Sequence, residues 1–371
     1  MINLFKKICR YIYRKHDEFM ISFKLKEIVL KQSNFLSIGS YKVIKAEKIL
    51  IYLDNEDVWQ FIDKNYYNFS NKKRGKVGRL FDSFFNFEIV ASASTDFSGQ
   101  LLMLTIDKDI KIFDFNGRQV LTIYKESEKI LQIKHAAFVF SPFFDHTLIS
   151  FSSEGYQLEE LVNQKYYHEL SDIEKNDIFK TLVFQYIEYF SSIDNELLPA
   201  VTTEEMCRQL KEEIPVRVFR IFERFLLNTD FKTLSWKRIF LHGDLNDSNL
   251  VLCNTKVKII DFERSKFYIF IFDIFNFIYV NHVSRNNYFF LSSYYKGEYD
   301  ILLTDLFEKF RMKYEINKKT EYMLLFMVER LIEKGLSRRW FNNDVLLFLQ
   351  EIEKLHVKQS SLEGEKNGKN T

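Results

Sequence analysis

Short hydrophobic runs in the first half of the chain follow the pattern of β-strands. Leu, Ile, Val, Thr and Phe dominate the runs at 100–107, 110–115 and 118–124, and each run has the length of a single strand. Asn116 and Gly117 separate the last two runs. This dipeptide predicts a type I′ hairpin turn, because both positions of that turn need positive φ.

A charged stretch and two further apolar runs follow this hairpin. The charged stretch at 126–133 is compatible with a short helix, and the runs at 136–140 and 146–152 are again typical of strands. We therefore expect the order of three strands, a short helix and two strands in this part of the chain.

Helical periodicity replaces the strand pattern after Gly155, apart from a patch near 240–262. Four segments have the spacing of helices: 156–170, 171–190, 324–332 and 345–355. Gly335 stands where the third of these helices needs a C-cap, and Asp344 stands where the fourth needs an N-cap.

These patterns divide the chain into four parts. Residues 1–85 form an N-terminal extension, and within it 17–85 shows no clear period. A strand-rich part follows at 86–153, and a mostly helical part at 154–357. The last residues, 358–371, are polar and lack any apolar period, which predicts a disordered tail.

Composition narrows the class of protein. The chain has 371 residues, of which 46% are hydrophobic and 28% charged, as expected of a globular protein. Its net charge of +2 argues against binding to nucleic acid through global charge. Aromatic residues are unusually frequent at 17%, while Pro numbers 3 and Gly 11, which excludes a collagen-like or largely disordered chain. An aromatic cluster such as 288–295 could therefore line a sugar pocket or fill the core, and core packing is the default.

The cysteines and the apolar runs predict a cytoplasmic protein. Cys9, Cys207 and Cys253 are far apart and odd in number, which excludes a disulfide framework and a cysteine-based zinc site. The longest apolar run, 267–280, contains Asp273 and is too short to span a bilayer. No secretory signal is visible, because charges interrupt the first apolar residues.

Residues 1–16 have a basic amphipathic pattern. Apolar residues from Ile2 to Ile12 share one helical stripe, basic residues fill the rest, and no acid appears before Asp17. Such a helix can bind peripherally to an anionic membrane surface. The alternative is a helix that docks on the core of the protein itself.

The densest group of chemistry-bearing residues lies at 240–263. Asp244 and Asn249 stand in a loop, a hairpin with its turn at 254–255 follows, and Asp261 ends the second strand. A tight hairpin would return Asp261 to the side of Asp244 and Asn249. Two carboxylates and one amide oxygen would then surround one point, and oxygen ligands of this kind suit Mg²⁺. Phosphoryl transfer needs such ligands, together with a group that deprotonates the attacking hydroxyl.

The residues His242-Gly243-Asp244 with Asn249, followed by Ile260-Asp261-Phe262-Glu263, resemble the aminoglycoside phosphotransferase and choline kinase family. This family is a branch of the protein-kinase-like fold. The resemblance implies an α+β, bilobal architecture. A small antiparallel-sheet N-lobe would occupy 86–153, and a larger, mostly helical C-lobe would occupy 154–357 and hold the catalytic loop at 240–263.

The resemblance also implies a role for each residue of the motif. Asp244 would be the catalytic base that accepts the proton of the substrate hydroxyl. Asn249 would be the second catalytic residue and would bind Mg²⁺ together with Asp261. His242 would be structural and hold the catalytic loop, and Asp273 would anchor the segment that follows the metal site.

ATP would be held by the N-lobe, where the family carries a strand lysine that pairs with a helix glutamate. Lys125 is the candidate lysine, with Lys111 and Lys134 as rivals. Glu126 and Glu128 are the candidate partners, and Glu128 is preferred because it lies further into the helix.

Two other nucleotide-binding features follow from the same comparison. No glycine-rich loop joins the first two strands, since their turn is only 107–109, and this departs from the family pattern. The segment 149–153, with Ile149 and Phe151, would be the hinge that binds adenine through its backbone.

Two features favour a small hydroxylated acceptor over a protein. Gly243 occupies the place of an arginine that protein kinases use to read a phosphorylated activation loop. Only eleven residues separate Asp261 from Asp273, which leaves no room for a long peptide-docking segment. The segment 298–357 holds 11 acids and 10 bases, whereas a polycationic aminoglycoside would prefer a more acidic pocket. A sugar, an amino alcohol or a cell-envelope glycan precursor is therefore the expected acceptor.

The leading hypothesis is thus an ATP- and Mg²⁺-dependent phosphotransferase that acts on a small-molecule hydroxyl. Two alternatives remain open at this point. One is a non-catalytic pseudokinase or scaffold of the same fold, and the other is a peripheral membrane protein defined by residues 1–16.

Overall fold

The computed structural model describes most of the chain after the first 26 residues. The described residues are 27–28, 31–44, 49–52, 55–65, 86–89, 97–105, 107–152, 155–162, 165–166, 170–227, 230–253, 256–333 and 343–368. The amphipathic helix expected at 1–16 lies outside them. Two compact units share the chain. The sheet unit comprises Met1–Lys134 and Thr147–Asn163, and the helical unit comprises His135–His146 and Gln164–Thr371.

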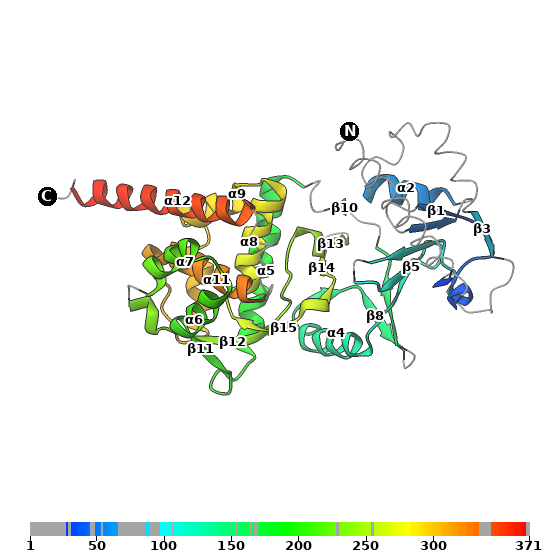
Figure 1. Ribbon diagram of the computed structural model, residues 1–371, viewed down its shortest axis with the longest axis horizontal. Helices are drawn as coiled ribbons and strands as arrows, with labels where there is room; N and C mark the ends of the chain where they lie inside the picture. The colour runs from blue at the N-terminus through cyan, green and yellow to red at the C-terminus, as the bar shows by residue number, and fades with distance from the viewer. Residues whose placement is uncertain are drawn as a thin grey trace, which may run out of the picture. The chain divides into compact units, whose positions relative to one another are not determined.

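The sheet unit is built on one antiparallel sheet in the order β3-β1-β2-β4-β5-β6-β9-β8. The strands are β1 (Gly39–Ile44), β2 (Ile49–Tyr52), β3 (Asn86–Ile89), β4 (Leu101–Leu104), β5 (Ile110–Asp114), β6 (Gln119–Ile123), β8 (Leu148–Phe151) and β9 (Tyr156–Glu160). The helix α2 (Glu56–Asn65) and a short 3-10 turn at Ser33–Phe35 complete the described part of this unit before α4 (Figure 1).

Alternation of side chains gives this sheet two apolar faces. One face carries Leu102, Ile112 and Leu121, which pack with Tyr41 and Phe97. The other face is covered by α2, whose Val58 and Ile62 pack against Leu101, Phe113 and Val120. A strand buried on both faces reads as a continuous apolar run, and this is why these segments were recognisable in the sequence.

The structure extends the sheet beyond the limits expected from the sequence. β1, β2 and α2 come from the segment 1–85, which we expected to be an extension separate from the sheet. β9 at Tyr156–Glu160 lies where a helix was expected over 156–170, and β10 (Lys165–Tyr166) also falls in that range. The expected helix is therefore wrong, because hydrogen bonding to β6 and β8 on either side of β9 outweighs a weak local helical pattern.

The hairpin between β5 and β6 is confirmed, but its turn type is not. Asp114 pairs with Gln119 across four loop residues, and only Arg118 among these four has positive φ, at 53°. The carboxylate of Asp114 accepts a hydrogen bond from the backbone nitrogen of Gly117 at 2.8 Å. This side-chain bond stabilises a longer turn in place of the expected type I′ turn.

The expected short helix is α4 (Ser127–Phe140), and it is longer than predicted. It includes residues 136–140, so the strand expected there is wrong. Ala136, Ala137 and Phe140 are buried on one side of the helix, while Phe138 is exposed. A short apolar run does not by itself distinguish a buried helix from a strand. β7 (Asp145–His146) and β8 account for the last expected run.

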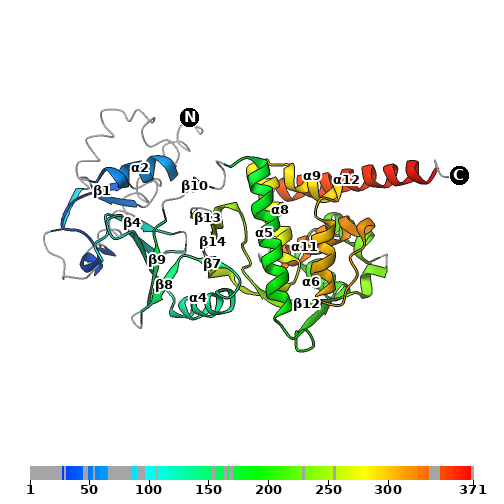
Figure 2. The ribbon, with the colours of Figure 1, turned by 180° about the vertical axis from the view of Figure 1, so that it is seen from behind.

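The helical unit surrounds two small sheets, ordered β10-β13-β14-β7 and β11-β12-β15. Their strands are β11 (Ala200–Thr202), β12 (Ser235–Leu241), β13 (Leu250–Cys253), β14 (Lys256–Ile259) and β15 (Lys266–Ile269), with β7 and β10. The described helices are α5 (Asp172–Ser191), α6 (Thr203–Glu213), α7 (Val216–Phe222), α8 (Phe272–Arg285), α9 (Phe289–Lys296), α10 (Asp300–Glu308), α11 (Lys319–Glu333) and α12 (Asn343–Gly368). Figures 1 and 2 both show α5 beside α8.

Aromatic side chains form much of the core of the helical unit. Trp236, Tyr186, Phe179 and Phe190 are among its largest fully buried side chains. The rings of Phe179 and Phe277 stack at a centroid distance of 5.0 Å and join α5 to α8. Within the cluster at 288–295, Phe290 and Tyr294 are fully buried, whereas Tyr288 is exposed. Core packing therefore explains the two buried rings of that cluster.

The ends of the helices follow the sequence in part. Ser171 and Glu174 form a capping box at the start of α5, as the helix expected at 171–190 requires. The buried face of α12, with Phe348, Leu349 and Ile352, is confirmed. α12 begins at Asn343, so Asp344 lies inside its first turn and does not precede it. Gly335 lies outside the described residues.

The disordered tail expected at 358–371 is contradicted as far as Gly368, because α12 continues to that residue. Adding a residue to an existing helix gains one hydrogen bond for one fixed residue, so a helix can extend through polar sequence.

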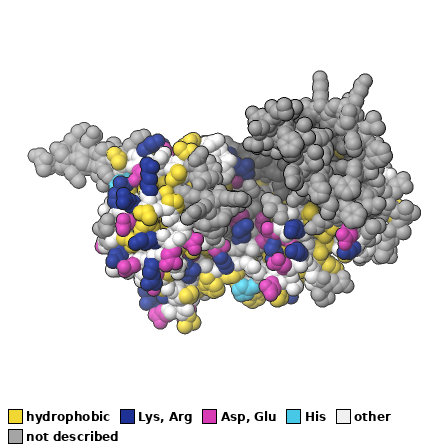
Figure 3. All heavy atoms as spheres, viewed as in Figure 1, with side chains coloured by type: hydrophobic (Ala, Val, Ile, Leu, Met, Phe, Trp, Pro, Cys, Tyr) yellow, Lys and Arg dark blue, Asp and Glu magenta, His cyan; other side chains and the backbone are white. Residues whose placement is uncertain are grey.

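The described side chains visible in Figure 3 carry charges of both signs, interspersed with one another. Among the helices of the described residues, none is long and apolar enough to cross a membrane.

The fold class expected from the sequence is confirmed. An antiparallel sheet forms one unit, and a larger, mostly helical unit contains the segment 240–263. The chain therefore has an α+β architecture.

Candidate active site

The loop that follows β12 is held at its base by a buried carboxylate. β12 lies between β11 and β15 and delivers His242 and Gly243 to the end of the sheet. Asp273, in the first turn of α8, accepts hydrogen bonds from the backbone nitrogens of His242 and Gly243, both at 2.8 Å. The hydroxyl of Tyr186 donates to the same carboxylate at 2.7 Å. Asp273 therefore ties α5, α8 and the loop together.

Burial is the main electrostatic influence on this anchor. Asp273 is only 1% exposed, and burial raises its pKa although the three hydrogen-bond donors act in the opposite direction. Burial and the neighbouring Asp273 also raise the pKa of Tyr186 well above its ordinary value. The phenol of Tyr186 therefore stays protonated and remains a hydrogen-bond donor over the pH range in which proteins are usually studied.

Gly243 is required by the backbone at this point. Its φ is +78°, a value that side chains other than glycine rarely adopt. A Cβ atom there would lie 2.6 Å from the ring of Tyr268 and would also overlap the backbone oxygen of Arg264. The ring of Tyr268 stacks on Phe272 at 4.2 Å and is buried, so it has no room to move. The absence of an arginine at position 243 therefore has a steric cause.

The ring of His242 links the loop to the hairpin that follows. Its Nε2 lies 2.9 Å from the backbone oxygen of Ile260, and its Nδ1 lies 3.3 Å from the backbone nitrogen of Asp244. A backbone oxygen needs a donor and a backbone nitrogen needs an acceptor, so this geometry corresponds to a neutral imidazole protonated on Nε2. The ring contributes to loop geometry through both nitrogens.

Asp244 and Asn249 lie within reach of each other. The amide nitrogen of Asn249 donates to the backbone oxygen of Asp244 at 2.8 Å and lies 3.5 Å from its Oδ2. The Asn246 amide donates to the same backbone oxygen at 2.7 Å. Asn249 is buried, whereas Asp244 is partly exposed. Neither of these two asparagines uses the carboxylate of Asp244 as its main partner, so that carboxylate remains available.

The β13–β14 hairpin returns Asp261 to this region, as the sequence predicts. The backbone nitrogen of Ile260 donates to the backbone oxygen of Asn249 at 3.1 Å, and the oxygen of Ile260 accepts from His242. Asp261 follows directly, with an exposed side chain and a left-handed φ of 67°. A residue other than glycine in this conformation is strained, and such strain is found mainly at functional sites.

Other residues of the site gave no clear signal in the sequence. Asp247 is buried and pairs with Arg285 of α8 at 2.8 Å. Asn276 is fully buried, and its amide donates to the backbone oxygen of Leu245 at 2.9 Å. Arg330 of α11 donates to the side-chain oxygen of Asn276. Only Asp247, which lies inside the motif, could have been found from sequence. The other three are 27 to 81 residues beyond Asn249.

The predicted nucleotide residues lie in the sheet unit and are arranged differently from expectation. Lys125 is exposed and follows the end of β6, and its backbone nitrogen donates to Asp109 at 2.9 Å. Glu128 is exposed in the first turn of α4. No ion pair between Lys125 and Glu128 is found among the residues that the structure describes. Lys129 instead pairs with the buried Asp109 at 2.7 Å.

The remaining candidates of the sheet unit occupy unexceptional positions. Lys111 lies in the middle of β5 opposite Thr122, and Lys134 is exposed on α4. Ile149 is exposed and Phe151 is partly buried on β8, which pairs with β9 through an irregularity between Leu148 and Ser150. None of these positions by itself assigns a contact with a nucleotide.

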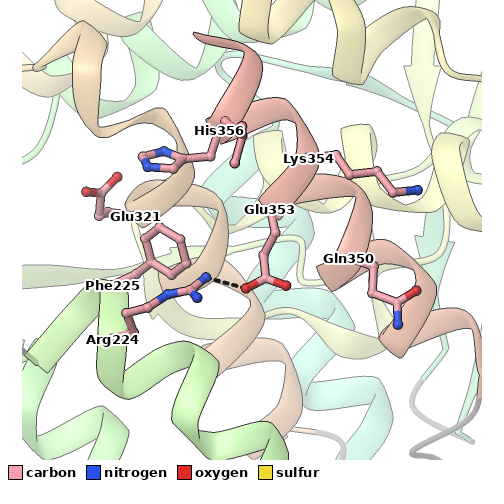
Figure 4. Close-up of a pocket in the computed structure, with 8 residues that line it drawn as sticks. Arg224, Phe225, Glu321, Gln350, Glu353, Lys354 and His356 are labelled. Carbon is pink, nitrogen blue, oxygen red and sulfur yellow. Dashed lines mark hydrogen bonds and ion pairs between the residues drawn. The ribbon is translucent and has the colours of Figure 1, made fainter. Parts of the chain in front are cut away.

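A cavity of about 990 Å³ lies elsewhere in the helical unit (Figure 4). Arg224 and Phe225 of the π-helical turn Glu223–Leu227, Glu321 of α11, and residues of α12 such as Glu353 and His356 line it. Arg224 forms an ion pair with Glu353 across the opening. The cavity includes none of the predicted site residues.

Three solved structures illustrate what the chain is similar to. The amicoumacin kinase hAmiN, in complex with AMP-PNP, Ca²⁺ and Ami, is 14% identical, with 69% of this chain and 88% of that chain covered and a TM-score of 0.42. Aminoglycoside phosphotransferase APH(4)-Ia is 12% identical, with 69% and 92% covered and a TM-score of 0.45. Choline kinase LicA from Streptococcus pneumoniae is 13% identical, with 67% and 89% covered and a TM-score of 0.38. No curated protein matches the chain.

The sequence also matches a family model over the site. Residues 187–290 match the model of the phosphotransferase enzyme family. The matched segment contains Asp244, Asn249, Asp261 and the anchor Asp273. This match supports the resemblance and the class of enzyme that the motif predicted, over residues 187–290.

Proposed function

We propose that the protein is an ATP- and Mg²⁺-dependent phosphotransferase that phosphorylates a hydroxyl of a small molecule, with Asp244 as the catalytic base. A sugar, an amino alcohol or a cell-envelope glycan precursor is the acceptor class. The observation that carries the proposal is the convergence of Asp244, Asn249 and Asp261 within one hydrogen-bonded loop and hairpin. The match to the phosphotransferase enzyme family supports it.

The donor set fits Mg²⁺. Asn249 uses only its amide nitrogen in the hydrogen bonds to Asp244, which leaves its side-chain oxygen for another partner. Asp261 offers an exposed carboxylate. Hard oxygen ligands of this kind are what Mg²⁺ prefers. When bound, the ion would neutralise negative charge on the phosphates of the nucleotide.

Asp244 has the properties of a base for the acceptor hydroxyl. Its backbone is fixed on both sides by His242 and Asn249, while the residue is partly exposed and its carboxylate accepts one long contact from the amide of Asn249. A carboxylate held in this way can orient a hydroxyl and accept its proton as the oxygen attacks the phosphoryl group.

The structure also supports an acceptor of small size. Only a 3-10 turn at Phe262–Arg264 and β15 lie between Asp261 and the start of α8 at Phe272. This connection has no loop long enough to form a docking segment for a peptide. Gly243 is sterically required, so an arginine cannot take its place.

A substitution of Asp244 tests the proposal. We expect Asp244→Asn to lower the rate of ADP formation by about a hundredfold or more with any accepted sugar or amino alcohol, because general base catalysis contributes on that scale. Binding of ATP with Mg²⁺, measured by calorimetry, should be retained. Asp177→Asn on the exposed face of α5 is the matched control and should keep full activity. An unchanged rate in the Asp244 variant refutes the assignment of the base.

A non-catalytic scaffold of the same fold is the second candidate. It is favoured by one observation, namely that Lys125 and Glu128 form no ion pair among the described residues. Thermal unfolding separates the two candidates. Stabilisation by ATP that depends on Mg²⁺, and that is lost in Asp261→Asn, supports the enzyme, whereas the lack of any stabilisation by nucleotide and metal supports the scaffold.

A further inference from the structure

Arg330 of α11 lies against the catalytic loop through a short chain of hydrogen bonds. Its guanidinium donates to the side-chain oxygen of Asn276, and the Asn276 amide donates to the backbone oxygen of Leu245 at 2.9 Å. The guanidinium also lies over the ring of Tyr279, 4.6 Å from its centre. These contacts fix an arginine beside the residue that follows Asp244.

The charge of Arg330 is not matched by an acid in contact with it. The neighbouring acids of α11 are used elsewhere, because Glu329 pairs with Arg238 at 2.8 Å and Glu333 pairs with Lys266. No carboxylate forms an ion pair with Arg330 among the residues that the structure describes. Arg330 is largely buried, and only a small part of the residue is exposed to solvent.

A second arginine adds to the same positive field. Burial lowers the pKa of Arg330, Tyr279 and the carboxylate of Asp244 act in the opposite direction, and the charge of Arg264 adds a smaller lowering effect. Arg264 is exposed and lies three residues after Asp261. An anion that binds the guanidinium of Arg330 would be a counter-charge for this arginine.

We infer that the acceptor carries a carboxylate or phosphate group that binds Arg330, with Arg264 as a second cation, while its hydroxyl faces Asp244. The guanidinium has five N–H donors in a planar fork that matches a carboxylate or phosphate in two-point contact, and only one of them is used by Asn276. The acceptor would then be a hydroxy acid or a phosphorylated sugar or alcohol. This inference rests on the proposed function and specifies its substrate class.

Two other roles for Arg330 give different results in experiment. The anion could be the phosphate chain of the nucleotide, in which case nucleotide and a free anion compete. Arg330 could instead act only as a brace that holds Asn276 and the loop. In that structural role Arg330 needs only to donate to Asn276, and the protein would not be expected to bind a free anion at this arginine.

Binding of inorganic phosphate to the full-length protein tests the inference. The affinity is measured by calorimetry at constant ionic strength, with sodium chloride as the reference, in the absence and presence of saturating AMP-PNP and Mg²⁺. The variants are Arg330→Gln, which removes the charge, and Arg330→Lys, which keeps the charge and a donor for Asn276. Arg217→Gln, on the exposed side of α7, is the matched control for loss of one positive charge.

We expect phosphate to bind the native protein and the Arg217 variant equally, with and without AMP-PNP. Arg330→Lys should raise the dissociation constant about tenfold, because the two-point contact is lost, and Arg330→Gln should abolish measurable binding. If Arg330→Gln fails to fold, the lysine variant still decides, since an unchanged dissociation constant there contradicts the inference.

Three results would overturn the inference: no binding of phosphate to the native protein, unchanged binding in Arg330→Gln, or loss of phosphate binding when AMP-PNP is present. The last result would assign the arginine to the nucleotide. Failure of the proposed function has a separate signature. AMP-PNP and Mg²⁺ would then not bind at all, while phosphate binding would still depend on Arg330.

Discussion

Replacement of Asp273 by asparagine should loosen the catalytic loop with little change in shape. The carboxylate accepts hydrogen bonds at one oxygen from the His242 nitrogen and the Tyr186 hydroxyl, at 2.8 and 2.7 Å. Its other oxygen accepts from the Gly243 nitrogen at 2.8 Å. An amide has only one acceptor oxygen, so its NH₂ group must face at least one of these donors.

The cost can be worked out bond by bond. The best orientation of the amide keeps the two bonds to His242 and Tyr186 and leaves the buried N–H of Gly243 unpaired, which costs about 1–3 kcal/mol. The two remaining bonds lose the strength that a charged acceptor gives, about 1 kcal/mol in all. Burial raises the pKa of Asp273, so removing its charge recovers part of this loss. We expect a net decrease of about 2 kcal/mol in the free energy of unfolding for Asp273→Asn.

Asp273→Ala provides the second point of the series. It leaves all three donors unpaired, so its cost should be about twice that of the asparagine variant or more. Urea unfolding followed by circular dichroism measures both, with Asp177→Asn as the exposed control. A decrease below about 0.5 kcal/mol for Asp273→Asn, within the range of ordinary surface substitutions, would show that this carboxylate does not hold the loop.

Two further variants test the surroundings of the loop. Gly243→Ala should lower the free energy of unfolding by about 3 kcal/mol. A left-handed φ costs alanine about 1–2 kcal/mol, and the new methyl group overlaps the packed ring of Tyr268. A decrease under about 1 kcal/mol in urea unfolding would contradict this. Burial raises the pKa of Glu329 from 4.5 to about 7. Between these two pH values, Glu329 is protonated in the folded state and ionised in the unfolded state. The free energy of unfolding should therefore fall as pH rises through that window, by at most about 1.4 kcal/mol per pH unit from this group. In Glu329→Gln, the free energy of unfolding should depend less on pH within this window. An equal slope in both proteins would show that other groups cause the pH dependence.

Features that depend on neighbouring residues could be predicted from the sequence. The hairpins β5–β6 and β13–β14 pair strands separated by short turns, so apolar runs and turn residues were sufficient to locate them. The second hairpin then required Asp261 to return toward Asn249, and the structure shows this contact through Ile260. Local spacing thus led to the three polar residues of the candidate site.

Features that depend on distant partners could not be predicted in the same way. β1 and β2 become strands because they pair with β3 and β4, and their own sequence has no clear period. The run at 136–140 is helical because it continues α4, although its apolar residues suit a strand equally well. Asn276 and Arg330 approach the loop only once α8 and α11 have packed beside it. Their residue types and positions in apolar helices give no indication of this role.

The way in which the loop is held also bears on catalysis. The hydrogen bonds that fix the loop run to backbone groups. Asp273 accepts from the nitrogens of His242 and Gly243, and Asn276 donates to the oxygen of Leu245. Fixing the backbone in this manner restricts the position of Asp244 without using its carboxylate. A reactive group gains from this arrangement, because the entropy of positioning is lost on folding and not in the transition state. The carboxylates of Asp244 and Asp261 remain accessible in this arrangement, as the proposed catalytic role requires.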